Sequence, residues 1–459
     1  MPLQLPSDLI VSVSGFRGRV GAPLTPELIA SLAAAFGAFL REEGAGSRVH
    51  LGRDSRVSGP MYADAARAGL LSVGCDCVDL GVVPTPTLLL AAEEAGSAGA
   101  LGVTASHNPA DWNALKFAGG DGVFLDAERM GRFQAFLRER EIVRVPWDEV
   151  GRASLDTGAV DRHLERILAL PYLDVEGIRA RGFHVALDCV RGAGGVMIPK
   201  LLAELGCRVS GIGLEPDGRF PRDPEPRADN LSELGELVRS SGAELGFAVD
   251  PDVDRLSLVA GDGEPVGEDL TLALCADVVL RREKGPVVTN LSTSQVVADV
   301  ARAAGVVPHR AAVGEINVAR RMQAEGAVIG GEGNGGIILP ALHLTRDAPV
   351  GVALILQHLV DLGAGLREAV DRWPSYTIVK EKAEFPRERV ADGYAALEAA
   401  FPGAGTDRTD GLRLAWPERG EWLHVRPSGT EPVVRFIAEA RDEGRALALV
   451  GEGRRAIGA

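Results

Sequence analysis

Three aspartates follow one apolar segment of the chain at alternate positions. Asp250, Asp252 and Asp254 come directly after Leu245–Val249, a run of the length and composition of a buried strand. Three carboxylates spaced in this way on a loop can converge on one hard cation, and Mg²⁺ accepts a few carboxylates and completes its shell with water or phosphate oxygens. An EF-hand calcium loop opens similarly, but Arg255 stands where that loop requires glycine. We therefore predict a magnesium site, with an acidic solvated turn as the alternative.

A serine follows a second apolar segment. Ser106 lies in the run T-A-S-H-N-P after Ala98–Val103, at the kind of strand end where open α/β sheets bind ligands. A serine hydroxyl needs help from a base or an electrophile to act as a nucleophile. His107 is adjacent, but neighbouring side chains on an extended segment point to opposite faces, so it need not be that base. Lys116 follows ten residues later. The alternative interpretation is a helix N-cap.

A glycine-rich run contains a carboxylate and an amide. Gly330–Gly336 satisfies G-x-G-x-x-G, but a dinucleotide site needs a helix at the third glycine, and here the extended run I-I-L-P follows. Glu332 and Asn334 each offer two hydrogen-bonding positions, which suits paired sugar hydroxyls. We therefore expect a loop that reads a polyhydroxyl ligand, with a plain glycine turn as the alternative. The sequence has no Walker A pattern.

Two basic turns have the composition of phosphate sites. The run R-P-S-G-T-E-P combines a guanidinium, two hydroxyls and a glycine backbone, which together suit a phosphate dianion. Its candidate residues are Arg426, Ser428, Gly429 and Thr430, with Arg435 beyond them. Near the N-terminus, Arg17 lies between two glycines in S-G-F-R-G-R and could reach a phosphoryl group. For both turns a surface turn is the alternative.

Alternating strands and helices must position most of these residues. Short apolar runs separated by segments of helical period predict parallel sheets with right-handed crossovers, in three blocks. The predicted strands are 48–51, 98–103, 183–188, 208–212, 245–249, 286–289, 308–313 and 327–330, and the predicted helices are 62–72, 160–170, 194–205, 231–240, 294–303 and 315–324.

The last block of the chain has a different pattern. Residues 376–385 alternate like a half-solvated strand, 411–425 form a predicted hairpin, 433–440 a further strand, and helices precede and follow the hairpin. Antiparallel strands with flanking helices predict an α+β domain. The expected domains are 1–152, 153–257, 258–370 and 371–459.

Composition and charge exclude several classes of partner. The chain has 459 residues with 49 Lys+Arg and 64 Asp+Glu, a net charge of −15, which argues against non-specific binding to nucleic acid or to anionic membranes. No run reaches the roughly 18 apolar residues of a transmembrane helix. The N-terminus lacks the basic region of a secretory signal, and the five cysteines are scattered. We expect a cytoplasmic protein.

Taken together and in this order, the motifs resemble the α-D-phosphohexomutase family. T-A-S-H-N-P resembles its phosphoserine loop, D-P-D-V-D-R its metal loop, G-E-G-N-G its sugar-recognition loop, R-P-S-G-T-E-P its phosphate-binding loop and G-F-R-G its N-terminal arginine motif. Gly52–Arg56 and Pro221–Pro226 add further matches. The resemblance implies three similar mixed α/β sandwich domains and a C-terminal α+β domain, with the active site in the cleft between the four.

The resemblance also implies the role of each site residue. Ser106 would carry the phosphoryl group and, with Asp250, Asp252 and Asp254, would hold Mg²⁺. Besides Ser106, the implied catalytic residues are Arg17, Lys116 and His107. The implied substrate-binding residues are Arg255, Glu332, Asn334, Arg426, Ser428, Gly429, Thr430 and Arg435.

The implied reaction is phosphoryl transfer on a hexose or hexosamine phosphate. Phospho-Ser106 would phosphorylate the sugar, the bisphosphorylated intermediate would reorient, and the other phosphoryl group would return to Ser106. A hexose bisphosphate would serve as activator, the C-terminal domain would close as a lid, and the protein would be a monomer or a homodimer.

Departures from the family pattern bear on proton transfer and substrate. Many members have G-E-x-S-G-H, whereas here Asn334 replaces the serine and Gly336 the histidine. Lys116, His107 or His343 remain as candidates for proton transfer. The block 312–318 and the run Arg346-Asp347-Ala348 resemble a subgroup of phosphoglucosamine mutases and broad-specificity phosphomannomutase/phosphoglucomutases. We favour conversion of glucosamine 6-phosphate to glucosamine 1-phosphate. The alternatives are a broad hexose specificity and a non-catalytic sugar-phosphate-binding paralogue.

Overall fold

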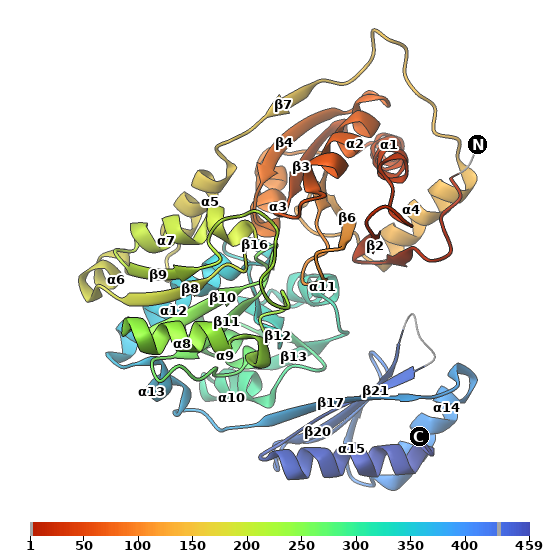
Figure 1. The fold of residues 1–459 in the computed structure, drawn as a ribbon. Coiled ribbons are helices and arrows are strands. Elements are labelled where there is room, and N and C mark those ends of the chain that lie inside the picture. Colours follow the sequence, from red (N-terminus) through yellow and green to blue (C-terminus); the bar gives the residue numbers. More distant parts are fainter. Residues whose placement is uncertain (1–2, 429–432) are drawn as a thin grey trace.

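The computed structural model describes residues 3–428 and 433–459, and these residues form four β-sheets (Figure 1). We number the regions around the sheets domains I to IV in chain order. In domain I the strand order is β1-β2-β6-β5-β3-β4-β7. Its strands are β1 (Ile10–Ser12), β2 (Gly15–Arg19), β3 (Arg48–Arg53), β4 (Asp76–Val82), β5 (Gly99–Val103), β6 (Trp112–Gly119) and β7 (Ala153–Leu155). Its helices are α1 (Pro26–Glu42), α2 (Gly59–Leu71), α3 (Thr85–Glu94) and α4 (Ala127–Glu139).

Domains II and III repeat the alternation with smaller sheets, in the orders β11-β10-β8-β9 and β13-β12-β14-β15-β16. Domain II contains α5 (Ala159–Leu168), α6 (Val175–Arg181), β8 (His184–Asp188), η1 (Ala193–Val196), α7 (Ile198–Glu204), β9 (Arg208–Ile212), η2 (Ala228–Asn230), α8 (Ser232–Ser241), β10 (Leu245–Val249) and β11 (Leu256–Ala260). Domain III contains α9 (Glu268–Arg282), β12 (Val287–Asn290), α10 (Gln295–Ala303), β13 (Pro308–Ala311), α11 (Glu315–Glu325), β14 (Ile329–Glu332), β15 (Gly336–Leu339), β16 (His343–Arg346), α12 (Ala348–Leu362) and α13 (Leu366–Val370).

Domain IV is built around a separate sheet in the order β17-β21-β20-β19-β18, whose neighbouring strands are all antiparallel. Figure 1 shows it, in blue, as the part of the chain set apart from the other three domains. Its elements are β17 (Thr377–Glu384), η3 (Arg387–Arg389), α14 (Val390–Ala400), β18 (Gly405–Asp407), β19 (Leu412–Trp416), β20 (Glu421–Pro427), β21 (Val433–Ala440) and α15 (Glu443–Ile457). The predicted α+β domain is therefore confirmed.

The sheets of domains I to III are mixed, whereas the alternation of strands and helices predicted parallel sheets. β8, β9 and β10 pair in parallel, but β11 returns antiparallel to β10. β6 is likewise antiparallel to β5, and β15 to β14. In each case the connection is too short for a crossover helix, and only an antiparallel strand can follow such a connection. The mixed α/β class implied by the family resemblance is confirmed.

Three of the chemical motifs lie on these short connections. The Ser106 run joins β5 to β6, the aspartate run joins β10 to β11, and the glycine run joins β14 to β15. Arg426 lies near the end of β20 and Arg17 within β2. A tight connection holds its side chains in a fixed place, because both flanking strands are hydrogen-bonded.

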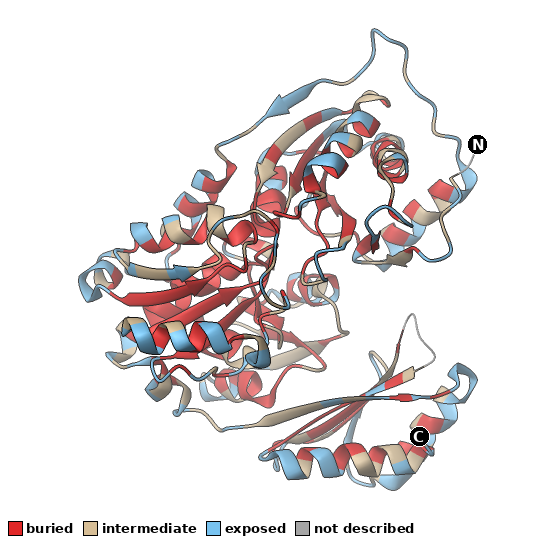
Figure 2. Ribbon diagram, viewed as in Figure 1, coloured by how far each residue is buried: buried red, intermediate tan, exposed pale blue. Residues whose placement is uncertain are grey.

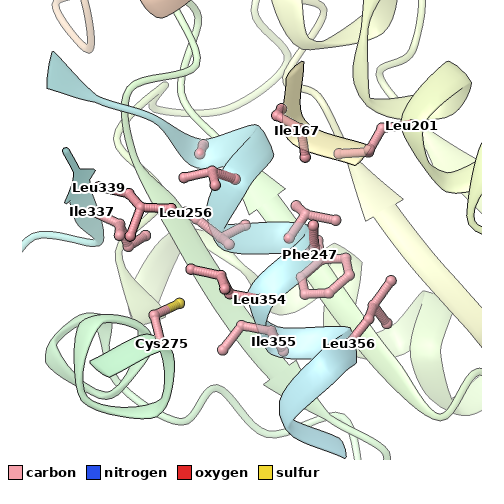
Figure 3. Packing of buried hydrophobic residues seen from close by; sticks show 14 of the residues in the cluster. Ile167, Leu201, Phe247, Leu256, Cys275, Ile337, Leu339, Leu354, Ile355 and Leu356 are labelled. Atoms are coloured by element: carbon pink, nitrogen blue, oxygen red, sulfur yellow. The ribbon is translucent and has the colours of Figure 1, made fainter. Parts of the chain in front are cut away.

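One core spans domains II and III and extends to α3 of domain I. The apolar helix α12 runs through it, and Figure 3 shows its Leu354 and Leu356 with Phe247 of β10 and Ile337 of β15 in the same cluster. Figure 2 shows the burial concentrated on the sheets, while domain IV keeps a core of its own. Among the described residues, no helix is long and apolar enough to cross a membrane.

Candidate active site

The three aspartates of the β10–β11 connection converge as predicted. Asp250, Asp252 and Asp254 are all buried, and one oxygen of each lies within 4.8 Å of the others. Val253 has φ 65°, a left-handed conformation that is uncommon for a β-branched residue and tightens the turn. Both backbone N–H groups that follow, of Asp254 and Arg255, donate to Asp250 Oδ1 at 3.1 and 3.2 Å. The loop is therefore folded around its own carboxylates.

This carboxylate group fits a divalent cation. Burial and the neighbouring Asp254 and Asp252 raise the pKa of Asp250 well above its usual range. Asp252 Oδ1 and Asp254 Oδ1 are buried without a hydrogen-bond partner, so each can bind a ligand that the chain itself does not supply. Buried carboxylates repel one another unless a cation lies among them, and an all-oxygen donor set suits Mg²⁺.

Ser106 lies directly against these carboxylates. Its Oγ donates to Asp250 Oδ2 at 3.0 Å, and its side chain is buried. The residue has φ 49°, so the segment is not extended there. For that reason the expectation that Ser106 and His107 point to opposite faces is wrong: Ser106 Oγ lies 3.3 Å from His107 Nδ1. Domain I thus presents its serine to the metal loop of domain II.

Arg56 holds the serine loop in this shape. Its guanidinium, which is buried, donates to the carbonyl oxygens of four loop residues, and its Nε donates to Asp54 at 3.0 Å. The four carbonyl groups belong to Ser106, Asn108, Pro109 and Trp112, at 2.6 to 2.9 Å. Sequence reasoning noted Arg56 only as part of a matching motif, since its partners are carbonyl groups about 50 residues away, which no sequence pattern reveals.

Replacement of Arg56 by methionine is expected to lower stability by about 2–4 kcal/mol and turnover by at least about 10-fold. The buried Ser106 carbonyl group and three partly buried carbonyl groups lose their donor, buried Asp54 loses its charged partner, and the serine loop loses its support. Urea unfolding and the turnover rate measure the two effects. Arg48→Met is the matched control, since Arg48 lies at the exposed end of β3 in the same domain. Equal behaviour of the two variants would contradict the role assigned to Arg56.

Two cationic side chains of domain I contact these loops, Lys116 the metal loop and Arg17 the serine loop. Lys116 Nζ, on β6, donates to Asp252 Oδ2 at 2.8 Å, and both groups are buried. Burial alone would raise the pKa of Asp252, but Lys116 outweighs that effect and holds the pKa well below its usual range. Arg17 donates to Asn108 Oδ1 of the serine loop at 3.3 Å. Arg17 and Lys116 therefore lie where a phosphoryl group on Ser106 would need counter-charges.

His107 is neutral at physiological pH. Burial, and then the positive charges of Arg255, Arg346 and Arg17, lower its pKa far below the usual value. Arg255 in turn donates to Glu225 Oε1 at 2.6 Å. Of the three candidates for proton transfer, His343 instead donates from Nε2 to Asp347 Oδ2 at 2.8 Å, in a buried cluster with His163. His107 is the imidazole in contact with Ser106.

The glycine-rich connection of domain III presents Glu332 at the end of β14. Glu332 Oε1 accepts from Asn290 Nδ2 at 2.8 Å and from the Gly314 backbone at 3.0 Å, while Oε2 accepts from Arg346 at 3.0 Å. Asn334 Oδ1 accepts from the Gly336 backbone at 3.2 Å, which leaves its amide nitrogen available. Arg346 also pairs with Asp254, so this loop is connected to the metal loop. Sequence reasoning missed Arg346 as a site residue.

Two arginines of domain IV face each other near the end of the β20–β21 pair. Arg426 of β20 and Arg435 of β21 stand directly opposite each other across the hairpin, and Arg387 donates to the Ser428 carbonyl group at 3.3 Å. Like charges at opposite positions are destabilising unless an anion lies between them, so this arrangement favours a phosphate. Arg426 also pairs with Asp410 at 3.0 Å. The predicted Gly429 and Thr430 lie outside the described residues.

The structure brings most of the predicted residues together. Hydrogen bonds or ion pairs connect Ser106 and Lys116 to the aspartates, and Arg346 connects Asp254 to Glu332. Domain IV contacts domain III through Ser292 and His424, 2.9 Å apart. The described contacts of Arg426 are to domain IV, and none joins it to the serine loop.

Comparisons with known proteins give one consistent result. Four family models match consecutive parts of the chain: phosphoglucomutase/phosphomannomutase alpha/beta/alpha domain I at residues 8–140, domain II at 161–263, domain III at 267–376, and the C-terminal domain at 379–455. A probable phosphoglucosamine mutase of Methanopyrus kandleri is 38% identical over 96% of this chain and 95% of that protein. A phosphoglucomutase/phosphomannomutase of Thermococcus kodakarensis is 37% identical over 94% of each chain. The crystal structure of a Burkholderia thailandensis phosphoglucomutase/phosphomannomutase family protein superimposes with a TM-score of 0.84 at 27% identity, over 98% of each chain.

Proposed function

The chain belongs to the phosphoglucomutase/phosphomannomutase family and is a phosphohexomutase, and we propose that it interconverts glucosamine 6-phosphate and glucosamine 1-phosphate. The observation that carries the substrate assignment is the acidic surplus at the sugar loop. Glu315 and Glu332 both lie against Arg346, which also pairs with Asp254 of the metal loop, so that even with Asp254 assigned to the metal two carboxylates face one guanidinium. A site with one carboxylate in excess favours a sugar that carries an ammonium group over one that carries a hydroxyl group.

The relatives support the same choice. Besides the Methanopyrus protein, a probable phosphoglucosamine mutase of Thermococcus kodakarensis is 34% identical over 97% of each chain. The second candidate is a broad phosphomannomutase/phosphoglucomutase activity, which the 37% identical Thermococcus protein of that name favours.

In the proposed mechanism Ser106 carries the phosphoryl group. The Oγ–P bond breaks as a sugar oxygen bonds to phosphorus, and the second half-reaction reverses these steps with the other phosphoryl group, so that the net change is an isomerisation. Ser106 and the three aspartates would hold Mg²⁺, which offsets the charge of the transferring group. Lys116 and Arg17 add positive charge from domain I.

The remaining residues bind the sugar and the second phosphate. The proton that the sugar hydroxyl loses passes to the leaving Oγ of Ser106. His107, which contacts Oγ, can orient it, but its lowered pKa makes the imidazole a weak base, and Lys116 is paired with Asp252 and remains charged. Glu332 and Asn334 bind the ring hydroxyl groups. Arg255, the last residue of the metal loop, pairs with Asp254 and with Glu225. Arg426, Ser428, Gly429, Thr430 and Arg435 would hold the phosphate that does not react.

Substrate preference is tested by turnover on glucosamine 6-phosphate, mannose 1-phosphate and glucose 1-phosphate, each with Mg²⁺ and a trace of hexose bisphosphate. We expect kcat/KM to favour the glucosamine phosphate by at least about 10-fold, the value of one well-placed charge interaction. Comparable rates on the three sugars would support the broad activity instead. No turnover on any of the three sugar phosphates would support the remaining alternative, a non-catalytic sugar-phosphate-binding paralogue.

Arg426→Ala is expected to raise KM about 10-fold or more with a smaller change in kcat, because a phosphate held equally in the ground and transition states contributes uniform binding. Steady-state kinetics separate the two constants. Arg419→Ala is the matched control, since Arg419 is exposed in the turn at the other end of β20. An unchanged KM for Arg426→Ala would exclude its role at the distal phosphate.

A further inference from the structure

Arg346 joins three loops through one guanidinium. It lies at the end of β16 and is buried, and its ion-pair partners are Asp254 of the metal loop, Glu332 of the sugar loop and Glu315 at the start of α11. The Glu332 and Glu315 pairs measure 3.0 and 3.2 Å. Arg346 is the one described residue with ion pairs to both the metal loop and the sugar loop. A guanidinium has five N–H donors in a rigid plane, so it can hold several carboxylates at once.

The space for Arg346 depends on Gly336. A Cβ atom at position 336 would lie 2.3 Å from Arg346 Cδ and 3.0 Å from Cγ, so any larger residue there displaces the arginine stem. Gly336 has no left-handed backbone conformation, so the requirement for glycine comes from this contact and not from its φ angle. Gly336 is also the position at which many family members have histidine.

The backbone that carries Arg346 is fixed from two sides. Its own N–H donates to Glu315 Oε1 at 2.9 Å. The next residue, Asp347, accepts from His163 Nε2 of α5 and His343 Nε2 at 2.8 Å each, and all three side chains are buried. Arg346 therefore has little freedom to follow one carboxylate away from the other.

We propose that Arg346 couples the metal loop to the sugar loop as a positioning residue. The proposal rests on the roles assigned above to Asp254 and Glu332. Arg346 pairs with Oδ2 of Asp254, whereas Oδ1 of the same carboxylate is buried without a hydrogen-bond partner. A cation held at Oδ1 would share the charge of this carboxylate with Arg346, so that the guanidinium would be held more by Glu332 and Glu315. Binding of the metal thus strengthens the hold on Glu332, and by linkage the sugar phosphate and the metal affect each other's affinity.

The test is Arg346→Met in the full-length protein, with both affinities measured by calorimetry. Mg²⁺ is titrated into chelator-treated protein, and glucose 6-phosphate is titrated with and without Mg²⁺. We expect Mg²⁺ to bind about 10-fold more tightly, because a competing positive charge next to Asp254 is gone. We expect glucose 6-phosphate to bind about 10-fold more weakly, because Glu332 loses a charge-assisted partner and the phosphate a nearby cation. The effect of Mg²⁺ on sugar affinity should shrink.

The opposite signs distinguish coupling from simple damage. If Arg346 only supported the fold, both affinities would fall together, and that result would overturn the proposal, as would two unchanged affinities. Arg282→Met is the matched control, since Arg282 makes a similar pair with Asp361 at 2.6 Å elsewhere in domain III. Arg346→Lys, which keeps the charge, should recover most of the normal Mg²⁺ affinity.

Gly336→Ala provides an independent approach. It should change both affinities in the same directions as Arg346→Met, and the double variant should be no worse than the single ones, since both remove the same contact. Gly131→Ala is its control, because nothing lies within 4 Å of a Cβ atom there. Additive effects would contradict the shared contact. These measurements use glucose 6-phosphate and need no turnover, so a failure of the glucosamine assignment leaves them interpretable.

Discussion

Replacing Ser106 by alanine is expected to reduce turnover at least about 10³-fold, or about 4 kcal/mol in the barrier, while leaving the protein folded. The expected loss is large because the phosphoryl group has no other carrier in the proposed mechanism. Incubation with a hexose bisphosphate should add one phosphoryl group to the wild-type chain and none to the variant, which mass spectrometry measures directly.

The fold should survive because little else depends on the Ser106 hydroxyl. The loop is held by backbone groups: the Ser106 carbonyl accepts from Arg56, and its N–H donates to Thr104 Oγ1 at 3.0 Å. The side chain loses only its contacts with Asp250 and His107. A variant whose activity and melting temperature fell together would therefore be uninformative on catalysis, and the thermal midpoint should be measured with the rate.

Ser97→Ala is a close control for this experiment. Ser97 precedes β5 as Ser106 follows it, and its Oγ lies 2.8 Å from a histidine Nδ1, that of His50, in a buried contact. The two variants thus remove the same kind of hydrogen bond from opposite ends of one strand. We expect Ser97→Ala to retain turnover and phosphorylation. Near-normal rates for Ser106→Ala would exclude the phosphoserine mechanism.

The sequence predicted the residues of the site better than the strands that follow them. The strand before the motif is a short apolar run that is recognisable in the sequence, such as 245–249 before Asp250. The strand after it, such as β11 or β15, is equally apolar, but alternation of strands and helices made a parallel sheet the natural expectation. The length of the connection was the signal that decided the direction of the strand.

The site residues that could not be identified from the sequence have partners that lie far away in the chain. Arg56 binds carbonyl groups, which every residue has, and Arg346 binds carboxylates at positions 254, 315 and 332. Neither spacing nor composition marks such a residue, because its role depends on tertiary packing. By contrast Asp250, Asp252 and Asp254 form a carboxylate cluster of the kind that local spacing can identify.

The local charge of the site opposes the charge of the whole chain. The protein carries −15 overall, yet Arg17, Lys116 and Arg255 gather around the metal loop, and Arg426 and Arg435 stand opposite each other in domain IV. An anionic substrate is therefore attracted only at close range, beyond which the acidic surface repels it. Because mobile ions screen the distant repulsive charges more than the buried attractive ones, added salt should speed sugar-phosphate capture modestly.

Asp252→Asn is expected to lower turnover at least about 100-fold and to weaken Mg²⁺ binding, since it removes one of three metal carboxylates and its charge. The measurement is a Mg²⁺ titration of both turnover and calorimetric binding. The Asp252→Asn variant should also lose folding stability, which can lower turnover independently of the metal. Lys116 Nζ lies 2.8 Å from Asp252, and both groups are buried, so loss of the carboxylate leaves a buried ammonium ion without its partner. Breaking such a pair costs about 3–5 kcal/mol.

A double variant separates the two effects of Asp252→Asn. Asp252→Asn with Lys116→Met removes the whole ion pair, and should regain much of the lost stability because neither charge remains buried alone. It should not regain turnover, since the metal site still lacks a carboxylate and the phosphoryl group also loses the cation of Lys116. If the double variant recovered both stability and activity, Asp252 would be a structural partner of Lys116 and not a metal ligand. An unchanged Mg²⁺ titration for the single variant would lead to the same conclusion.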